Sequence, residues 1–240
     1  MDFCKTIIHI VQQGDTFYRL AQRYQTTVPD IILRNPGVNP YNLQIGTRLR
    51  ICSGLEESMG SPMQKDEIDL NKDMRKAWAQ HGFWGTLYLV SLYHDLPNQD
   101  ETQKRLLQTA GDIAEVFGKF YSQTMENQLK VLLTEHIELA GDLMKALKDG
   151  NEQEAARLEQ EWRQNADKIA GMLASANPNY DYEELQRMLQ MHLDLMKQQM
   201  TTDLDGNHEE FVKATDENAE QLMKIADMLT EGIMKQFYRS

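Results

Sequence analysis

Apolar residues recur at helical spacing along most of the chain, from about residue 66 to residue 237. Five short polar segments rich in Gly, Pro, Asn, Asp or Ser interrupt this pattern. They lie at 96–100, near 122–124, and at 148–152, 175–181 and 203–207. Because residues of these types favour turns and end helices, the pattern predicts six helices. The helices are expected at about 66–95, 100–121, 124–149, 152–174, 181–202 and 207–237.

The first 52 residues show a shorter and more mixed pattern. Residues 6–11, TIIHIV, and 47–52, TRLRIC, are rich in β-branched and apolar residues, which is typical of strands. Two short helices are predicted between them. Asp15 stands at the N-cap position of the first helix, and Pro29 fits the first position of the second. The predicted order is therefore β-α-α-β.

The two patterns are separated by residues 53–65, SGLEESMGSPMQK, which have no periodicity and are predicted to be a linker. The chain then divides into a small domain at 1–52 and an acidic helical bundle at 66–240. The net charge is +1 for residues 1–60 and −13 for residues 61–240. An acidic body without a basic stripe argues against a nucleic-acid partner, and no apolar run is long enough to span a membrane.

The helical part contains segments that resemble each other. LLTEHIEL at 132–139 is similar to MLQMHLDL at 188–195, and NADKI at 165–169 is similar to NAEQL at 218–222. A fainter third copy surrounds His81. Repeats of this spacing suggest stacked helical hairpins. The predicted fold class is an α+β module (β-α-α-β) followed by an all-α bundle of about six helices in three antiparallel hairpins.

Each hairpin is expected to set a histidine level with a polar residue on the facing helix. The pairs, each equidistant from the turn between its members, are His81 with Asp112, His136 with Asn165, and His192 with Asn218. The histidines also lie on apolar helix faces. A buried polar ring without a hydrogen-bond partner would cost about 1–3 kcal/mol.

Two interpretations of these histidines are open. In the first, each ring is satisfied by the Asn or Asp of its own hairpin, which gives a structural polar layer. In the second, His81, His136 and His192 converge on a metal or small ligand, with Glu135 nearby. No carboxylate stands three residues before any of these histidines, so the E-x-x-H signature of di-iron bundles is absent. The first interpretation is favoured, and no metal and no cofactor are predicted.

The N-terminal pattern resembles a LysM domain over residues 5–52. The residues that carry the resemblance are the G-D-T of 14–16, the A-x-x-Y of 21–24, the N-P of 39–40 and the L-x-x-G-x-x-L-x-I of 43–51. LysM domains bind glycans that contain N-acetylglucosamine, such as peptidoglycan or chitin, and do no chemistry themselves. The resemblance therefore implies a shallow groove for such a glycan.

The implied groove lies between the turn at 14–17 and the loop at 39–43. Its expected residues are Gly14, Asp15, Thr16, Phe17, Asn39, Pro40, Tyr41, Asn42 and Leu43. Backbone groups should make most of the contacts with the sugar, since neutral hydroxyl and amide groups need no charged partner. Capping of the first helix by itself explains Asp15, and turn formation by itself explains Asn39.

The only two cysteines in the sequence, Cys4 and Cys52, both belong to the first domain. They could be two incidental small apolar residues. Antiparallel pairing of the first and last strands would also make them neighbours, and a disulfide between them would be permitted in an oxidising exterior.

The helical part, with QHGFWGTL, LLTEH, NADKIA, ANPNY and EGIMKQF, resembles an uncharacterised helical family of spore-forming Gram-positive bacteria. The expected function is non-catalytic binding of peptidoglycan, which anchors the acidic bundle to the cell wall or spore envelope, where it could contact envelope proteins. The N-terminal residues lack the features of a signal peptide, as expected for a protein made in the mother cell around a spore. The alternatives are a metal-dependent or redox enzyme targeted by its LysM domain, and a cytoplasmic interaction module.

Overall fold

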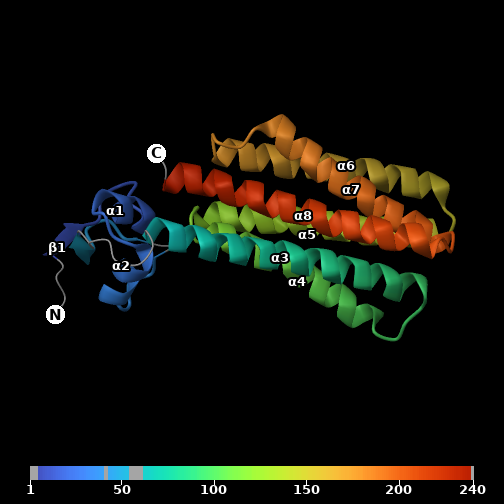
Figure 1. Ribbon diagram of the computed structural model, residues 1–240, viewed down its shortest axis with the longest axis horizontal. Coiled ribbons are helices and arrows are strands. Elements are labelled where there is room, and N and C mark those ends of the chain that lie inside the picture. Colours follow the sequence, from blue (N-terminus) through green and yellow to red (C-terminus); the bar gives the residue numbers. More distant parts are fainter. Residues whose placement is uncertain (1–4, 41–42, 54–61, 239–240) are drawn as a thin grey trace.

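The computed structural model describes residues 5–40, 43–53 and 62–238 (Figure 1). In chain order the elements are β1 (Lys5–Ile10), α1 (Phe17–Arg23), α2 (Val28–Arg34), β2 (Arg48–Ser53), α3 (Pro62–Tyr93), α4 (Gln99–Gly118), α5 (Gln123–Lys148), α6 (Glu152–Ala176), α7 (Tyr182–Leu204) and α8 (His208–Phe237). A β-α-α-β module is followed by six long helices, which confirms the predicted fold class. Among the helices in these ranges, none is both long and apolar enough to cross a membrane.

The N-terminal module folds around a small core of its own. Strands β1 and β2 pair antiparallel, with Ile7 opposite Ile51. Side chains alternate along β2, so Leu49 and Ile51 are buried while Arg48 and Arg50 are exposed. The core residues of the module are Val11, Phe17, Leu20, Ala21, Ile31, Leu49 and Ile51.

Threonine side chains begin both helices of the module. Thr16 and Thr27 each accept a hydrogen bond, at 3.2 Å, from the backbone N–H three residues later. The prediction that Asp15 caps the first helix is therefore wrong by one residue, because Asp15 is bonded elsewhere. Pro29 lies in the first turn of α2, where its missing N–H removes no intrahelical hydrogen bond.

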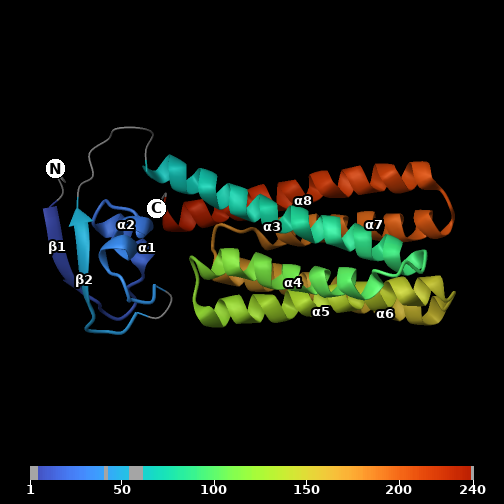
Figure 2. The ribbon, with the colours of Figure 1, turned by 90° about the horizontal axis from the view of Figure 1, so that it is seen from below.

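The six long helices lie side by side along the long axis of the molecule (Figure 1). Consecutive helices pack as antiparallel pairs, α3 with α4, α5 with α6 and α7 with α8, and α3 also packs against α8. The turns inside the three pairs lie at the end far from the module, whereas the α4–α5 and α6–α7 turns lie next to it (Figure 2). Predicted and observed helix ends differ by four residues or fewer.

The polar breaks in the sequence supply the residues that begin four of these helices. Ser122, Asn151, Asp181 and Asn207 each accept a hydrogen bond from the backbone N–H three residues later. Such caps satisfy donors that a helix leaves unpaired at its start. The predicted linker is shorter than expected at its C-terminal side, because α3 already begins at Pro62.

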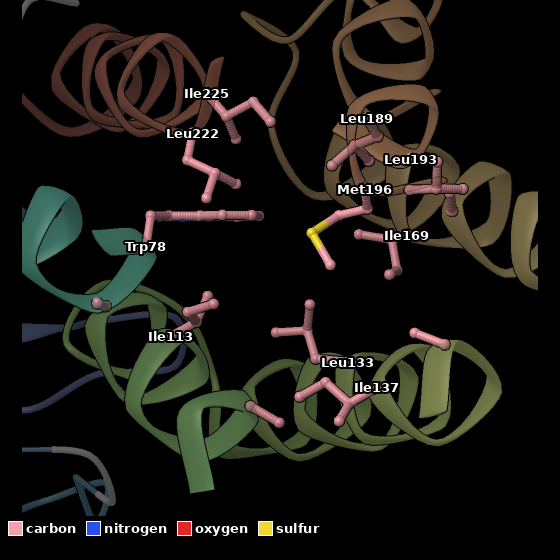
Figure 3. Packing of buried hydrophobic residues seen from close by; sticks show 14 of the residues in the cluster. Trp78, Ile113, Leu133, Ile137, Ile169, Leu189, Leu193, Met196, Leu222 and Ile225 are labelled. Atoms are coloured by element: carbon pink, nitrogen blue, oxygen red, sulfur yellow. The ribbon is translucent and has the colours of Figure 1, made fainter. Parts of the chain in front are cut away.

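The interior of the bundle is filled by one continuous set of apolar side chains from all six helices. In Figure 3, Trp78 from α3, Leu133 from α5, Met196 from α7 and Leu222 from α8 extend toward a common centre. Each helix places an apolar stripe on this core and a charged face toward solvent. Burial of these stripes is what holds the helices together.

Aromatic side chains join the module to the bundle. Tyr18 of α1 stacks on Phe120, in the α4–α5 turn, with ring centroids 4.4 Å apart. Phe237 and Tyr238, at the end of α8, lie 6.0 and 6.1 Å from the Tyr18 ring. As a result α1 and α2 lie between the two strands and the end of the bundle (Figure 2). The sequence holds one signal of this contact, since Tyr18 is an aromatic residue outside the apolar face of its own helix.

Gly232 of α8 lies directly against the ring of Tyr180, and a Cβ at this position would overlap the ring. The ring cannot easily move, because the Tyr180 hydroxyl donates a hydrogen bond of 2.6 Å to the Leu229 carbonyl. We therefore expect Gly232→Ala to lower the free energy of unfolding by about 1–3 kcal/mol, as overpacked cores do. Urea unfolding followed by circular dichroism measures the change.

Gly171, inside α6, provides the matched control for this substitution. A Cβ there would lie 3.8 Å from Tyr182 Cε2, which is an ordinary van der Waals contact. Gly171→Ala should raise the free energy of unfolding by up to about 1 kcal/mol, because alanine favours helix more than glycine does. Equal stabilisation by both substitutions would contradict the close packing of Tyr180 on α8.

Candidate functional site

A cleft with a volume of about 500 Å³ lies where the module meets the bundle. This volume falls within the range of about 300–1,000 Å³ that is usual for small-molecule sites. The module wall comes from the start of α1, the first turns of α2 and the loop after α2. Its residues include Thr16, Tyr18, Pro29, Ile32, Pro40 and Leu43.

Five of the nine predicted groove residues line this cleft, namely Asp15, Thr16, Phe17, Pro40 and Leu43. Phe17 is only 1% exposed, and its side chain belongs to the module core. Gly14 forms the preceding turn with φ at 85°, a conformation that favours glycine, and Asn39 is exposed beside the cleft. Tyr41 and Asn42 lie outside the described residues.

The carboxylate of Asp15 is engaged within the module. Its Oδ2 accepts hydrogen bonds from His9 Nε2 at 2.6 Å and from the Gln12 N–H at 2.8 Å, while the Tyr24 hydroxyl lies 2.8 Å from His9 Nδ1. Burial acts to raise the pKa of Asp15, but the hydrogen bonds from Gln12 and His9 and the charge of Arg23 outweigh it, so the pKa is lowered. Asp15 therefore holds the turn before α1 in shape. Sequence reasoning missed these contacts, in which His9 comes to Asp15 from β1 and Tyr24, directly after α1, bonds to His9.

The bundle wall combines carboxylates with aromatic rings. Asp66, Asp69 and Asp73 stand three and four residues apart on α3 and so share the helix face that lines the cleft. Lys119, in the α4–α5 turn, forms an ion pair of 2.5 Å with Asp73. Phe120 and Tyr238 add apolar surface. The wall is acidic overall and presents hydrogen-bond acceptors beside an apolar floor.

The comparisons with known proteins identify the module. Residues 9–51 match the LysM domain, so this part of the chain is a LysM domain, as its sequence pattern predicts. Such a domain implies binding of peptidoglycan or a similar glycan, and an association with cell walls. No curated protein and no solved structure matches the chain. The resemblance of the helical part to a family of spore-forming bacteria thus gains no support from a relative.

The three predicted histidines meet in the middle of the bundle. His81 comes from α3, His136 from α5 and His192 from α7, and all three are buried. Their ring centroids lie 5.8 Å (His81 to His192), 6.2 Å (His136 to His192) and 6.5 Å (His81 to His136) apart. The hairpins place them at one level because their turns lie at the same end of the molecule (Figure 2).

Each histidine is also bonded within its own hairpin. His136 Nδ1 lies 3.1 Å from Asn165 Oδ1, and His192 Nδ1 lies 2.7 Å from Asn218 Oδ1. The expected partner of His81 is wrong, because its Nδ1 lies 3.1 Å from the hydroxyl of Thr109. Thr109 is one turn before Asp112 and fully buried, where a neutral hydroxyl costs less than a carboxylate.

Asp112 faces outward instead of into the bundle. Its carboxylate accepts a hydrogen bond of 2.9 Å from Arg105, and its side chain is 43% exposed. Glu135 is likewise 46% exposed and accepts a hydrogen bond from Asn165 Nδ2 at 3.0 Å. Glu135 therefore orients the partner of His136 and does not join the three rings.

The hydrogen bonds assign the proton on each ring. The Thr109 hydroxyl donates to the Leu106 carbonyl at 2.6 Å, so it accepts from His81 Nδ1–H, and the amide oxygens of Asn165 and Asn218 are acceptors as well. Each Nε2 then carries a lone pair. A small cavity of about 20 Å³ lies between the three rings and Trp162, enough for one water molecule, which needs about 10–15 Å³.

Burial lowers the pKa of all three histidines and keeps them neutral. For His81 the nearby His192 and His136 rings add to this effect, since protonation would place like charges side by side, and for His136 burial and the neighbouring His192 lower the pKa to about 3. Within the residues that the structure describes, no group of three or more His, Cys, Asp or Glu side chains is arranged to hold a metal ion.

The bond between His136 and Asn165 can be measured with a double-mutant cycle. His136→Leu should lower the free energy of unfolding by about 1–3 kcal/mol, because it leaves the buried Asn165 oxygen without its donor. In the background of Asn165→Leu the same substitution should cost less, since no acceptor remains to be satisfied. Urea unfolding of the four proteins gives the coupling energy. Strictly additive effects would contradict a bond between the two side chains.

The three histidines also predict how stability depends on pH. Their folded pKa values lie below the unfolded value of 6.5, so the stability they contribute is complete above pH 6.5 and is lost as the pH falls below it. Each ring should add a slope approaching about 1.4 kcal/mol per pH unit. We expect His136→Gln to reduce the slope between pH 6.5 and 5.5 by about 1 kcal/mol per pH unit, as measured by urea unfolding.

The predicted pairing of the cysteines remains a prediction. Cys52 is buried in β2, opposite Thr6 of β1, whereas Cys4 lies outside the described residues.

Proposed function

We propose that the protein binds a glycan containing N-acetylglucosamine through its LysM domain and thereby anchors the acidic helical bundle to that glycan. The observation that carries this proposal is the LysM match at residues 9–51, and the cleft beside Thr16, Pro40 and Leu43 is consistent with it. The module has its own apolar core and the helices have another, which supports one role for each part. In this division the LysM domain docks and the helices α3 to α8 are the cargo.

The chemistry of the partner follows from the cleft. Neutral sugars present hydroxyl and amide groups on one side and C–H groups on the other, which suits backbone groups beside apolar side chains such as Pro40 and Leu43. A single site of this kind should bind weakly. Several copies on one polymer would bind much more firmly, since linked sites raise the effective concentration. Peptidoglycan or chitin offers many such sites on one strand.

The location we propose is the bacterial cell wall or spore envelope, with the bundle exposed for contact with envelope proteins. The spore part rests on the resemblance of the helical sequence to a family of spore-forming bacteria. Tagged imaging during sporulation would test it directly, and a diffuse signal throughout the cytoplasm would contradict it.

One observation favours the alternative of an enzyme in the bundle, namely the convergence of His81, His136 and His192. The chemistry would then need a ligand between three Nε2 atoms. Metal analysis of protein purified without chelator and without an affinity metal distinguishes the two ideas. One equivalent of a transition metal per chain, lost in His136→Gln, would favour the enzyme.

Sedimentation with insoluble peptidoglycan tests the docking role. The whole chain should co-sediment, and Ile32→Asp should weaken its apparent affinity about fivefold or more, because Ile32 lines the cleft and is 42% exposed. Leu33→Asp is the matched control, since Leu33 is the next residue, is 79% exposed and does not line the cleft. Failure of the whole chain to sediment with peptidoglycan or chitin would contradict the proposed function.

A further inference from the structure

We infer that the bundle is more than cargo: its end forms the second wall of the glycan site, so that an N-acetylglucosamine oligosaccharide binds between the LysM domain and α3. This inference rests on the proposed function and adds to it a contribution from residues outside the LysM domain. The occupant is a short, neutral stretch of glycan.

The geometry of the cleft supports two walls. The module wall includes Ile32 and Leu43, and the bundle wall includes Asp69 of α3 and Tyr238 after α8. Both walls line one cavity of about 500 Å³. A ligand in the LysM groove therefore lies within reach of the bundle, and the predicted groove is only one side of this cleft.

The aromatic contacts hold the two walls in place. Tyr18 stacks on Phe120 at 4.4 Å, and both residues also line the cleft. Phe120 packs in turn near Phe237 and Tyr238, at 5.7 and 6.3 Å between ring centroids. Stacked and tilted aromatic pairs stabilise a contact by more than the area they bury, so these pairs favour one orientation of the module on the bundle. The cleft thus exists before a ligand arrives, which lowers the cost of binding.

The chemistry of the bundle wall fits sugar. The Asp69 and Asp73 carboxylates are exposed on the face of α3 that lines the cleft, and ionised carboxylates accept strong hydrogen bonds from hydroxyl and amide groups. Tyr238, which is partly exposed, adds apolar surface on which the C–H face of a sugar ring can pack. Lys119 pairs with Asp73, so the charge of this carboxylate is already balanced when a neutral sugar approaches.

Filling the cleft from the bundle side tests the inference in the whole chain. Asp69→Trp places a large ring on an exposed position of α3 that lines the cleft and lies outside the LysM domain. Asp216→Trp is the matched control, because Asp216 is an exposed aspartate of α8 that does not line the cleft. Ile32→Asp, on the module wall, serves as the reference for loss of the LysM groove. Chitotetraose is the ligand, and isothermal titration calorimetry gives its Kd.

We expect Asp69→Trp to raise the Kd about tenfold or more, and Asp216→Trp to leave it within about twofold. If Ile32→Asp weakens binding while Asp69→Trp does not, the glycan binds the module wall alone, and the inference is overturned while the proposed function stands. If the unsubstituted chain binds neither chitotetraose nor peptidoglycan, the proposed function is contradicted, and the inference that rests on it falls as well. Thermal unfolding confirms that each variant is folded.

Hydrogen exchange provides a measurement that needs no variant. In the unsubstituted chain, saturating chitotetraose should slow exchange of backbone amides in residues 66–73 of α3 as well as in the LysM domain. Residues 152–176, which form α6, should be unaffected because they do not line the cleft. Protection confined to the LysM domain would overturn the inference even if Asp69→Trp failed to fold.

Discussion

The architecture depends on one constraint, the need of six long helices to bury their apolar faces together. Each helix carries an apolar stripe that water disfavours, and antiparallel packing of neighbours along the chain removes these stripes from solvent. Short turns connect the helices at both ends of the bundle. At the end next to the LysM domain, the α4–α5 turn and the last turn of α8 bring Phe120, Phe237 and Tyr238 together. Tyr18 docks on that end, so the orientation of the LysM domain follows from the packing of helices that are distant in sequence.

The same apolar interior contains a layer of polar side chains that need hydrogen-bond partners inside the bundle. His81, His136 and His192 reach the centre of the bundle from three helices, and each gives its Nδ1 proton to a partner in its own hairpin. These bonds fix the register of each pair of helices, since a shift by one turn would separate the ring from its acceptor. Of the second interpretation only the convergence of the rings is observed, since no group of described side chains is arranged to hold a metal ion. The rings are paired locally and they also converge, around a cavity large enough for a single water molecule.

In the proposed function, acidic residues of the helical part contribute to glycan binding through α3. A LysM domain by itself offers a shallow groove, and a shallow groove binds a neutral sugar weakly. In this chain the groove is opposite a helix that carries Asp66, Asp69 and Asp73 on the facing side. Carboxylates that would repel nucleic acid or an anionic membrane are suitable acceptors for sugar hydroxyls. The bundle and the LysM domain thus form one surface in the proposal, although their cores are separate.

The sequence by itself determined the elements and the identity of the module. Local signals were sufficient for this, because G-D-T, N-P and the apolar periodicity each act over a few residues, and the breaks at Ser122, Asn151, Asp181 and Asn207 are the caps themselves. Equal distance from a turn also predicted the pairing of His136 with Asn165 and of His192 with Asn218.

Only the tertiary structure decided which polar group enters a shared core. His81 pairs with Thr109 and not with Asp112, because burying a neutral hydroxyl costs less free energy than burying a carboxylate. Counting residues from the turn takes no account of this cost of burial. Asp15 likewise proved to be bonded to His9, a residue of another element. The contact between Tyr18 and Phe120, and with it the second wall of the cleft, joins residues about one hundred positions apart, and no local pattern specifies which surfaces of two separately folded parts will meet.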